Sequence, residues 1–333
     1  MPGKNRDGVV LAMGRCVSRR APLPFPRPRR EGFFRLPRSA RDRTVLRLLR
    51  ASFGSVSFLL PGVSARCAER LFRTPARNPR LPREAQTLAR GVFRREAFGK
   101  GFLATWTFGS GPPVLLVHGW GGHAGRLYRF VEALVAGGFS VITFDAPGHA
   151  ESSGSESSLP DFAAAINYLA TVHGPLAGIV GHSLGATASA LVVRRGLRVP
   201  RIVLLAPGAD PEQYTFRFAH YFRIPTNVHA GMKQRLAERY SVAWNDLRLD
   251  TPIGSAPAEM LVIHDRGDAR VPWRDGKAIA DAWPGAQLIT TRGLGHHKIL
   301  RDSGVVAAAV AFLAAPQARR RRRAAGPASR AIS

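Results

Sequence analysis

The sequence has little cysteine and no long apolar run, and each shortage excludes a class of protein. Only Cys16 and Cys67 occur among 333 residues, so no disulfide framework of the kind that small secreted domains use is legible. No stretch reaches the roughly 18–20 apolar residues that a membrane-spanning helix needs. Arginines follow the short apolar patch at 9–13, where a secretory signal would have its cleavage site. We therefore expect a reducing, cytoplasmic location.

Acidic residues are also few, but the imbalance is confined to the ends of the chain. The protein has 22 Asp and Glu against 49 Lys and Arg, for a net charge of +27. Residues 1–43 and 44–100 each hold 12 basic and 3 acidic residues, and the last 18 hold 6 arginines and no acid. Residues 101–315 hold 19 basic and 16 acidic residues. The middle is therefore a nearly neutral domain, and 45% apolar composition is ordinary for a chain that folds around a core.

The two ends differ in composition from the middle. Residues 1–43 are rich in Arg and Pro without an apolar period, and residues 316–333 include five consecutive arginines at 319–323, so both are predicted to be disordered extensions. Residues 44–91 are predicted to hold a helical segment and a proline-containing linker at 72–82. The amphipathic stretch 44–60 is compatible with a membrane surface, but packing against the main domain is the preferred interpretation.

From residue 92 to 315, short apolar runs alternate with segments of helical length. This pattern predicts an α/β fold with a mostly parallel, eight-stranded sheet flanked by helices. The expected strands are 92–98, 102–108, 114–118, 140–144, 177–181, 201–205, 260–264 and 287–290. The expected helices are 126–136, 160–172, 184–195, 273–283 and 303–314. Residues 207–257 interrupt the alternation, contain aromatic residues and a helical piece near 232–240, and are predicted to form a small lid.

The sharpest motif is GHSLG at 181–185, which lies between a predicted strand and a predicted helix. A turn this tight forces Ser183 into a strained backbone conformation, and side chains two residues away on either side would collide with neighbouring structure. The turn would hold the Ser183 hydroxyl at the carboxyl edge of the sheet, at the N-terminus of a helix. Ser183 is therefore the candidate nucleophile.

A serine hydroxyl needs a base to take its proton, and the base needs a carboxylate to hold it. His296 follows Gly295 after the last expected strand and is the candidate base, while His297 is interpreted as a neighbour at the pocket rim or in solvent. Two aspartates follow the strand at 260–264. Asp268 is preferred as the triad acid, with Asp265 as the alternative; either can instead cap the loop.

The segment HGWGG at 118–122 follows an apolar strand. A glycine-rich loop lets backbone N–H groups point into an open site, where they can bind the oxyanion of a tetrahedral intermediate. The N–H groups of Trp120 and Leu184 are the expected donors, and the Trp120 side chain is expected to line the pocket. The glycine spacing does not match the phosphate-binding patterns.

These motifs, in the order Ser183, Asp268, His296 with HGWGG upstream, resemble the α/β-hydrolase fold superfamily. The segment DAPGHA at 145–150 is similar to a loop that in this superfamily commonly reads Asp-x-Pro-Gly-His-Gly, with Ala150 as a departure. The resemblance covers residues 92–315 and implies that Asp145 and His149 are structural. Serine at the turn argues against epoxide hydrolases and dehalogenases of this fold, which have aspartate there, and against the polymer-forming acyltransferases, which have cysteine.

We therefore predict a serine hydrolase of carboxylesterase or lipase type that acts on a small-molecule or lipid ester and needs no metal or other cofactor. Three alternatives stay open: an acyltransferase, a thioesterase, or a non-catalytic binding protein on a hydrolase scaffold. No specific nucleic-acid partner is expected, and at most a peripheral membrane contact; the sequence leaves the oligomeric state open.

Overall fold

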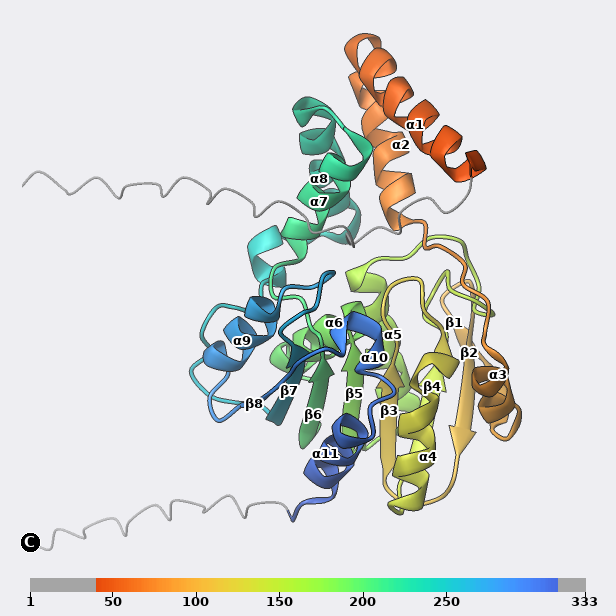
Figure 1. The fold of residues 1–333 in the computed structure, drawn as a ribbon, viewed down its shortest axis with the longest axis vertical. Helices are drawn as coiled ribbons and strands as arrows, with labels where there is room; N and C mark the ends of the chain where they lie inside the picture. The colour runs from red at the N-terminus through yellow and green to blue at the C-terminus, as the bar shows by residue number, and fades with distance from the viewer. Residues whose placement is uncertain (1–39, 317–333) are drawn as a thin grey trace, which may run out of the picture.

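The computed structural model describes residues 40–316, and an eight-stranded sheet forms its centre (Figure 1). The strands are β1 (Val92–Phe98), β2 (Gly101–Phe108), β3 (Pro113–Val117), β4 (Ser140–Phe144), β5 (Gly178–His182), β6 (Arg201–Leu205), β7 (Glu259–Asp265) and β8 (Gln287–Thr291). They lie side by side in the order β1-β2-β4-β3-β5-β6-β7-β8. The pairs β1–β2 and β2–β4 are antiparallel and the others are parallel, which confirms the predicted fold class.

Helices cover both faces of the sheet, which is why the central strands are apolar throughout. One layer contains α5 (Leu159–His173), α6 (Leu184–Arg194) and α9 (Trp273–Ala282). The other contains α3 (Pro82–Ala89), α4 (Tyr128–Ala136) and α11 (Ser303–Ala314). Successive side chains of a strand point to opposite faces, so Ile179 of β5 packs in the first layer and Val180 in the second.

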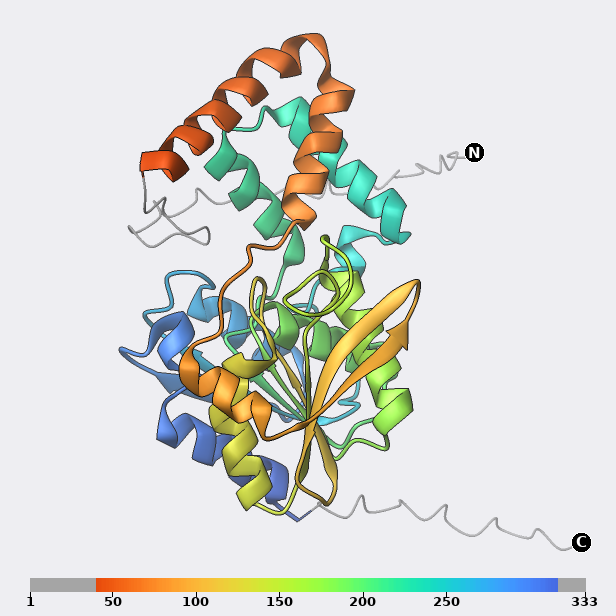
Figure 2. The same cartoon turned by 90° about the vertical axis from the view of Figure 1, so that its right-hand side faces the viewer.

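Four further helices form a cap over the carboxyl ends of the parallel strands (Figures 1 and 2). They are α1 (Ala40–Leu59), α2 (Pro61–Arg73), α7 (Pro211–Phe222) and α8 (Thr226–Tyr240). Phe53 of α1 and Ala68 of α2 share one apolar cluster with Phe218 of α7 and Met232 of α8. The helix expected over 44–60 thus packs on the lid insertion, not on the sheet layers.

The insertion itself is more helical than its sequence suggested, since only the piece near 232–240 was expected. The linker between cap and body is 74–81, shorter than the expected 72–82. The remaining short helices of the described chain are η1 (Ala124–Leu127), η2 (Trp244–Leu247) and α10 (Gly295–Lys298). The predicted disorder of the two extensions concerns residues that lie almost entirely outside those that the structure describes.

Candidate active site

Ser183 occupies a sharp turn between β5 and α6. Its backbone has φ 52° and ψ −120°, a left-handed conformation that is rare for any residue with a Cβ. The flanking glycines are required by close backbone approaches. A Cβ on Gly181 would lie 2.6 Å from Ala186 Cα, and a Cβ on Gly185 would lie 2.3 Å from the carbonyl oxygen of His118. The turn is therefore held between the helix that follows it and the strand beside it.

The structure brings Ser183, His296 and Asp268 together from three distant parts of the chain. His296 Nε2 lies 3.1 Å from Ser183 Oγ, and His296 Nδ1 lies 2.7 Å from Asp268 Oδ2. An ionised carboxylate only accepts hydrogen bonds, so Nδ1 carries the proton and the Nε2 lone pair faces the serine hydroxyl. All three side chains are buried. The arrangement has the contacts that a serine nucleophile and its base require.

Asp268 is held as a carboxylate by its neighbours. Its Oδ1 accepts hydrogen bonds from the N–H groups of Arg270 at 2.8 Å and Val271 at 2.9 Å. Burial alone would raise the pKa of Asp268, but the hydrogen bonds from His264 and His296 outweigh it and bring the pKa far below its usual range. Asp268 is therefore charged at neutral pH, as a group that stabilises an imidazolium must be.

Asp265, the alternative acid, has a different set of partners. Its Oδ2 accepts from Thr291 Oγ1 at 2.8 Å and from the Leu294 N–H at 3.0 Å, and its Oδ1 accepts from the Gly267 N–H at 2.8 Å. It fastens the end of β7 to the loop that carries His296. The geometry thus favours Asp268 as the partner of His296 and leaves Asp265 as an anchor for the loop.

Two histidines that were not singled out from the sequence contact the candidate triad and its loops. His182 Nε2 donates to the carbonyl oxygen of His296 at 2.9 Å, which ties the serine turn to the histidine loop. His264 Nε2 donates to the carbonyl oxygen of Val271 at 3.0 Å and lies 3.5 Å from Asp268 Oδ2. The only sequence signals were the place of His182 within GHSLG and the four-residue spacing of His264 from Asp268. His297, in contrast, is exposed.

The HGWGG loop is fixed by residues of the neighbouring loop after β4. His149 Nε2 accepts from the Gly121 N–H at 3.0 Å, and His118 Nε2 accepts from the Ala146 N–H at 2.9 Å. Burial lowers the pKa of both rings, to about 4 for His149, so each stays neutral and able to accept. The neighbouring N–H of Trp120 and that of Leu184, the first residue of α6, are the candidate oxyanion donors, since the first N–H groups of a helix have no partner within it.

Asp145 and the linker complete this support. Asp145 Oδ1 accepts from the Ala124 N–H at 2.7 Å, and its Oδ2 accepts from Arg80 Nη2 at 2.8 Å. Asn78 Nδ2 donates to the carbonyl oxygen of Gly121 at 2.7 Å. The linker thus crosses over the glycine-rich loop and holds it in place. Within residues 40–316, no group of three or more His, Cys, Asp or Glu side chains is arranged to hold a metal ion.

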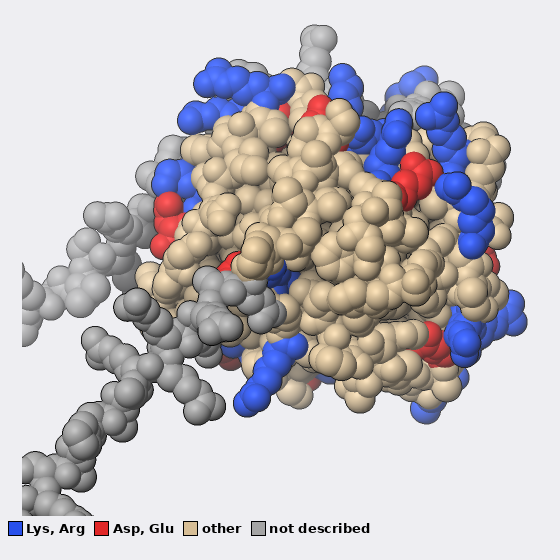
Figure 3. Space-filling model, turned by 90° about the horizontal axis from the view of Figure 1, so that it is seen from below, with Lys and Arg blue, Asp and Glu red and all other residues tan. Residues whose placement is uncertain are grey.

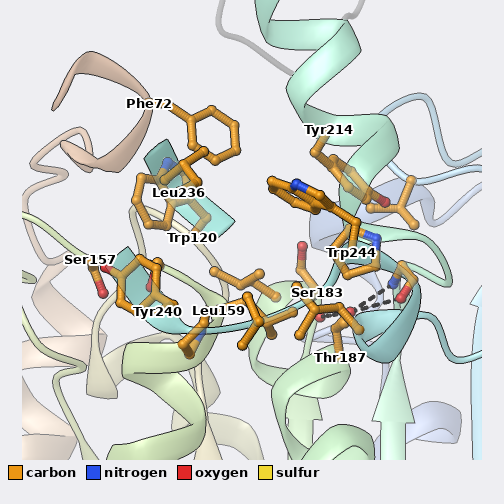
Figure 4. Close-up of a pocket in the computed structure, with 18 residues that line it drawn as sticks. Phe72, Trp120, Ser157, Leu159, Ser183, Thr187, Tyr214, Leu236, Tyr240 and Trp244 are labelled. Carbon is orange, nitrogen blue, oxygen red and sulfur yellow. Dashed lines mark hydrogen bonds between the residues drawn. The ribbon is translucent and has the colours of Figure 1, made fainter. Parts of the chain in front are cut away.

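A pocket between cap and body encloses about 940 Å³ of empty space, including its open mouth, and Ser183 lies at its floor (Figure 4). Trp120 lines it, as expected, together with Tyr214 and Trp244 of the insertion. Phe72, from the end of α2, and Leu236 of α8 lie across the pocket from the serine. The contribution of Phe72 was not foreseen, because its segment was assigned to a linker. The 18 residues that line the pocket include no Asp, Glu, Lys, Arg or His.

The sheet order and the strand–serine–helix turn define the class: this is an α/β hydrolase. The family model described as "Serine aminopeptidase, S33" matches residues 112–297, more than half of the chain, so the chain belongs to this family. Among curated proteins it is similar to a pimeloyl-[acyl-carrier protein] methyl ester esterase from Chromobacterium violaceum, with 46% identity over 81 residues. That match covers 24% of this chain and 30% of the relative's length.

Solved structures share the fold at low identity. An esterase from Exiguobacterium antarcticum matches with 15% identity and a TM-score of 0.52, over 68% of this chain and 100% of its own. The mouse α/β hydrolase domain-containing protein 10 matches with 18% identity and a TM-score of 0.50, over 67% of this chain and 96% of its own. At these identities the likeness establishes the fold alone.

Proposed function

We propose that this protein is a serine hydrolase that cleaves carboxylic ester bonds of small-molecule or lipid substrates through a covalent acyl-enzyme. The observation that carries the proposal is the contact chain from Ser183 Oγ to His296 Nε2 at 3.1 Å and from His296 Nδ1 to Asp268 Oδ2 at 2.7 Å. These groups lie at the floor of an apolar pocket, where an ester carbonyl can approach the serine.

In the proposed cycle, His296 takes the Ser183 proton as Oγ bonds to the ester carbonyl carbon. The carbonyl oxygen becomes an oxyanion, which accepts hydrogen bonds from the Trp120 and Leu184 N–H groups. The carbon–oxygen bond to the alcohol then breaks, and His296 Nε2 gives its proton to the departing alkoxide. His296 next takes a proton from water, whose oxygen attacks the acyl carbon; release of the acid returns the proton to Ser183.

The pocket favours an ester over a peptide with a free amino terminus. An aminopeptidase must compensate the ammonium group of its substrate, and a buried charge is costly unless it is paired. The residues lining the described pocket offer no carboxylate for that purpose. The partial relative, by its name, acts on a methyl ester. We therefore assign to this chain an ester whose acyl and alcohol groups are uncharged near the serine.

Hydrolysis of p-nitrophenyl esters of short and medium chain length tests the proposal. Ser183→Ala should lower kcat/KM by at least about 10³-fold, because the nucleophile is lost while the pocket remains. Ser189→Ala is the matched control: Ser189 lies on the same helix, and its hydroxyl only donates to the carbonyl oxygen of Gly185 at 2.7 Å. Equal activity of the parent and Ser183→Ala would refute the proposal.

Two additional assays separate the alternatives. Aminoacyl p-nitroanilides should be hydrolysed far more slowly than the matching esters, and efficient cleavage would favour the aminopeptidase activity. A product that forms only with an added alcohol or amine acceptor would identify an acyltransferase, whereas the proposal expects the free acid.

A further inference from the structure

The α1–α2 hairpin presents an unusual number of large apolar side chains to solvent. Of the 14 large apolar residues exposed within the described chain, seven lie between residues 45 and 63. The three at the corner between the helices are the most prominent run: Phe58 is 88% exposed, Leu59 76% and Leu60 54%. Such a concentration on one element indicates a binding surface, since scattered exposed apolar residues would need no explanation.

These exposed side chains lie on a different side of α1 from the residues that pack it into the cap. Phe53 of α1 is buried in the cap cluster, and Leu46 and Leu49 are half-buried. The exposed residues of α1 form a separate stripe. At about 100° per residue, Val45, Leu48, Val56 and Leu59 fall within roughly 80° of arc on the helix surface. The hairpin therefore has one apolar side that packs in the cap and a second that is exposed among the described residues 40–316.

The exposed charge on this hairpin is positive. Arg43, Arg47, Arg66 and Arg70 are exposed. Glu69, the acidic residue among the described side chains of the two helices, is only 3% exposed and is occupied by Arg73, Arg235 and Arg239. An exposed apolar surface on a hairpin whose exposed charge is positive fits a partner that is both apolar and anionic.

The hairpin corner also lies at the end of the molecule farthest from the sheet (Figures 1 and 2). On the opposite face the Lys and Arg side chains are distributed around the edge (Figure 3). A projecting corner of large apolar side chains can enter a fluid interface, whereas a folded partner would need a matching cavity. A second copy of this chain would set like charges against each other. No described helix is long and apolar enough to cross a membrane.

We propose that the α1–α2 hairpin docks on an anionic lipid bilayer. The corner residues Phe58, Leu59 and Leu60 enter the interface, and exposed arginines such as Arg47 and Arg66 contact lipid phosphates. This orientation places the cap against the lipid, with Phe72 linking the docked helix to the pocket wall. The binding surface does not depend on the proposed function, and Ser183→Ala should bind equally well.

Co-sedimentation of the full chain with phosphatidylcholine vesicles, with and without phosphatidylserine, tests the proposal. The parent should bind the phosphatidylserine vesicles, and binding should weaken with salt. The triple variant Phe58→Ser/Leu59→Ser/Leu60→Ser should bind at least about tenfold more weakly. The double variant Arg47→Glu/Arg66→Glu should bind the phosphatidylserine vesicles roughly tenfold or more weakly than the parent. Its binding to pure phosphatidylcholine vesicles should not change.

The matched control is Val172→Ser/Arg198→Glu, which makes the same kinds of change at exposed positions on the body, near the amino ends of β5 and β6. It should bind within about twofold of the parent. The hairpin variants and the control variant should keep the thermal unfolding transition of the parent, which shows that they are folded, and they should hydrolyse a soluble p-nitrophenyl ester as the parent does.

Three results would overturn the proposal. The first is that the full chain does not bind anionic vesicles. The second is that the triple variant binds as the parent does, which would assign the attraction to arginines outside the hairpin. The third is self-association, measured by sedimentation velocity, that the triple variant abolishes while vesicles are not bound. That result would make a second copy the occupant of the corner.

Discussion

Asp265 ends β7 and Asp268 lies three residues further on, yet their contacts assign them different tasks. Asp268 contacts the histidine beside the serine, while Asp265 contacts the loop on which that histidine lies. Asp268 controls which ring nitrogen of His296 carries the proton. Asp265 controls where the His296 ring lies. Substitution of each by its amide separates these two contributions.

Asp268→Asn should lower kcat/KM by about 10³–10⁴-fold, because an amide can donate to Nδ1 and stabilise the tautomer whose Nε2 carries the proton. Asp265→Asn keeps His296 paired with its carboxylate and should cost less than about tenfold in kcat/KM, with a lower Tm. The measurement is ester hydrolysis beside thermal unfolding of both variants. A larger catalytic loss in Asp265→Asn would reverse the assignment.

Ala150 adopts φ 39°, a left-handed conformation that favours glycine. This is the position where the resembling loop commonly has glycine, so the departure in the sequence has a backbone cost in the structure. Ala150→Gly should raise the free energy of unfolding by about 0.5–1 kcal/mol, measured by urea unfolding. Ala85→Gly, at an exposed position inside α3, should instead lower the free energy of unfolding. Destabilisation by both substitutions would show that Ala150 is not strained.

The candidate site residues could be predicted from the sequence because each lies in a distinctive local pattern after an expected strand. GHSLG identified Ser183, and Gly295 identified its neighbour His296. The choice between Asp265 and Asp268 rested only on their distance from the strand end. The contacts of His182 and His264 were inaccessible, since each joins loops that meet only in the folded protein.

At the scale of elements, the sheet was predictable and the cap was not. The central β-strands of the body are largely apolar runs between turn residues, and each strand end lies within one position of its expected place. The helices of the cap are amphipathic, but an apolar stripe does not say which surface it will meet. Phe53 on α1 belongs to the same apolar cluster as Phe218 on α7, across a long separation in sequence. The aromatic residues of α7 also favour strand over helix, which explains why that helix was missed.

Glu69 links α2 to α8 and should control the stability of the cap. Its carboxylate accepts hydrogen bonds from Arg235 at 2.8 Å and Arg239 at 2.6 Å. Burial opposes ionisation, but these arginines outweigh it and lower the pKa of Glu69 below its ordinary value. A lowered folded-state pKa stabilises the fold above the ordinary pKa of about 4.3 and loses that effect as the pH falls through the folded-state value.

Glu69→Gln should therefore destabilise the cap by about 1–3 kcal/mol at neutral pH, and the difference from the parent should shrink as the pH is lowered below about 4. Hydrogen exchange of the α2 and α8 amides measures this locally. Glu238→Gln, an exposed change on α8, is the control and should cost less than about 0.5 kcal/mol. A difference that grows on acidification would contradict the assigned sign.

At the scale of the whole molecule, the candidate site is built by a stretch of sequence that excludes residues 1–39 and 317–333. Every residue that lines the pocket lies between Phe72 and Val271, and the triad ends at His296. A chain without residues 1–39 and 317–333 should keep kcat/KM for soluble esters within about twofold of the parent. Removal of residues 1–73 should abolish activity, because it deletes Phe72 and exposes the apolar cluster of α7 and α8. Retained activity in the shorter chain would mean that α1 and α2 do not build the site.

The most direct measurement is the intact mass of the full chain after treatment with a fluorophosphonate, followed by peptide mapping. A fluorophosphonate labels a serine only where a neighbouring base and an oxyanion site activate it. Our account predicts a single adduct on Ser183, absent in Ser183→Ala and strongly slowed in His296→Ala. An unlabelled parent, or an adduct that persists in Ser183→Ala, would contradict it.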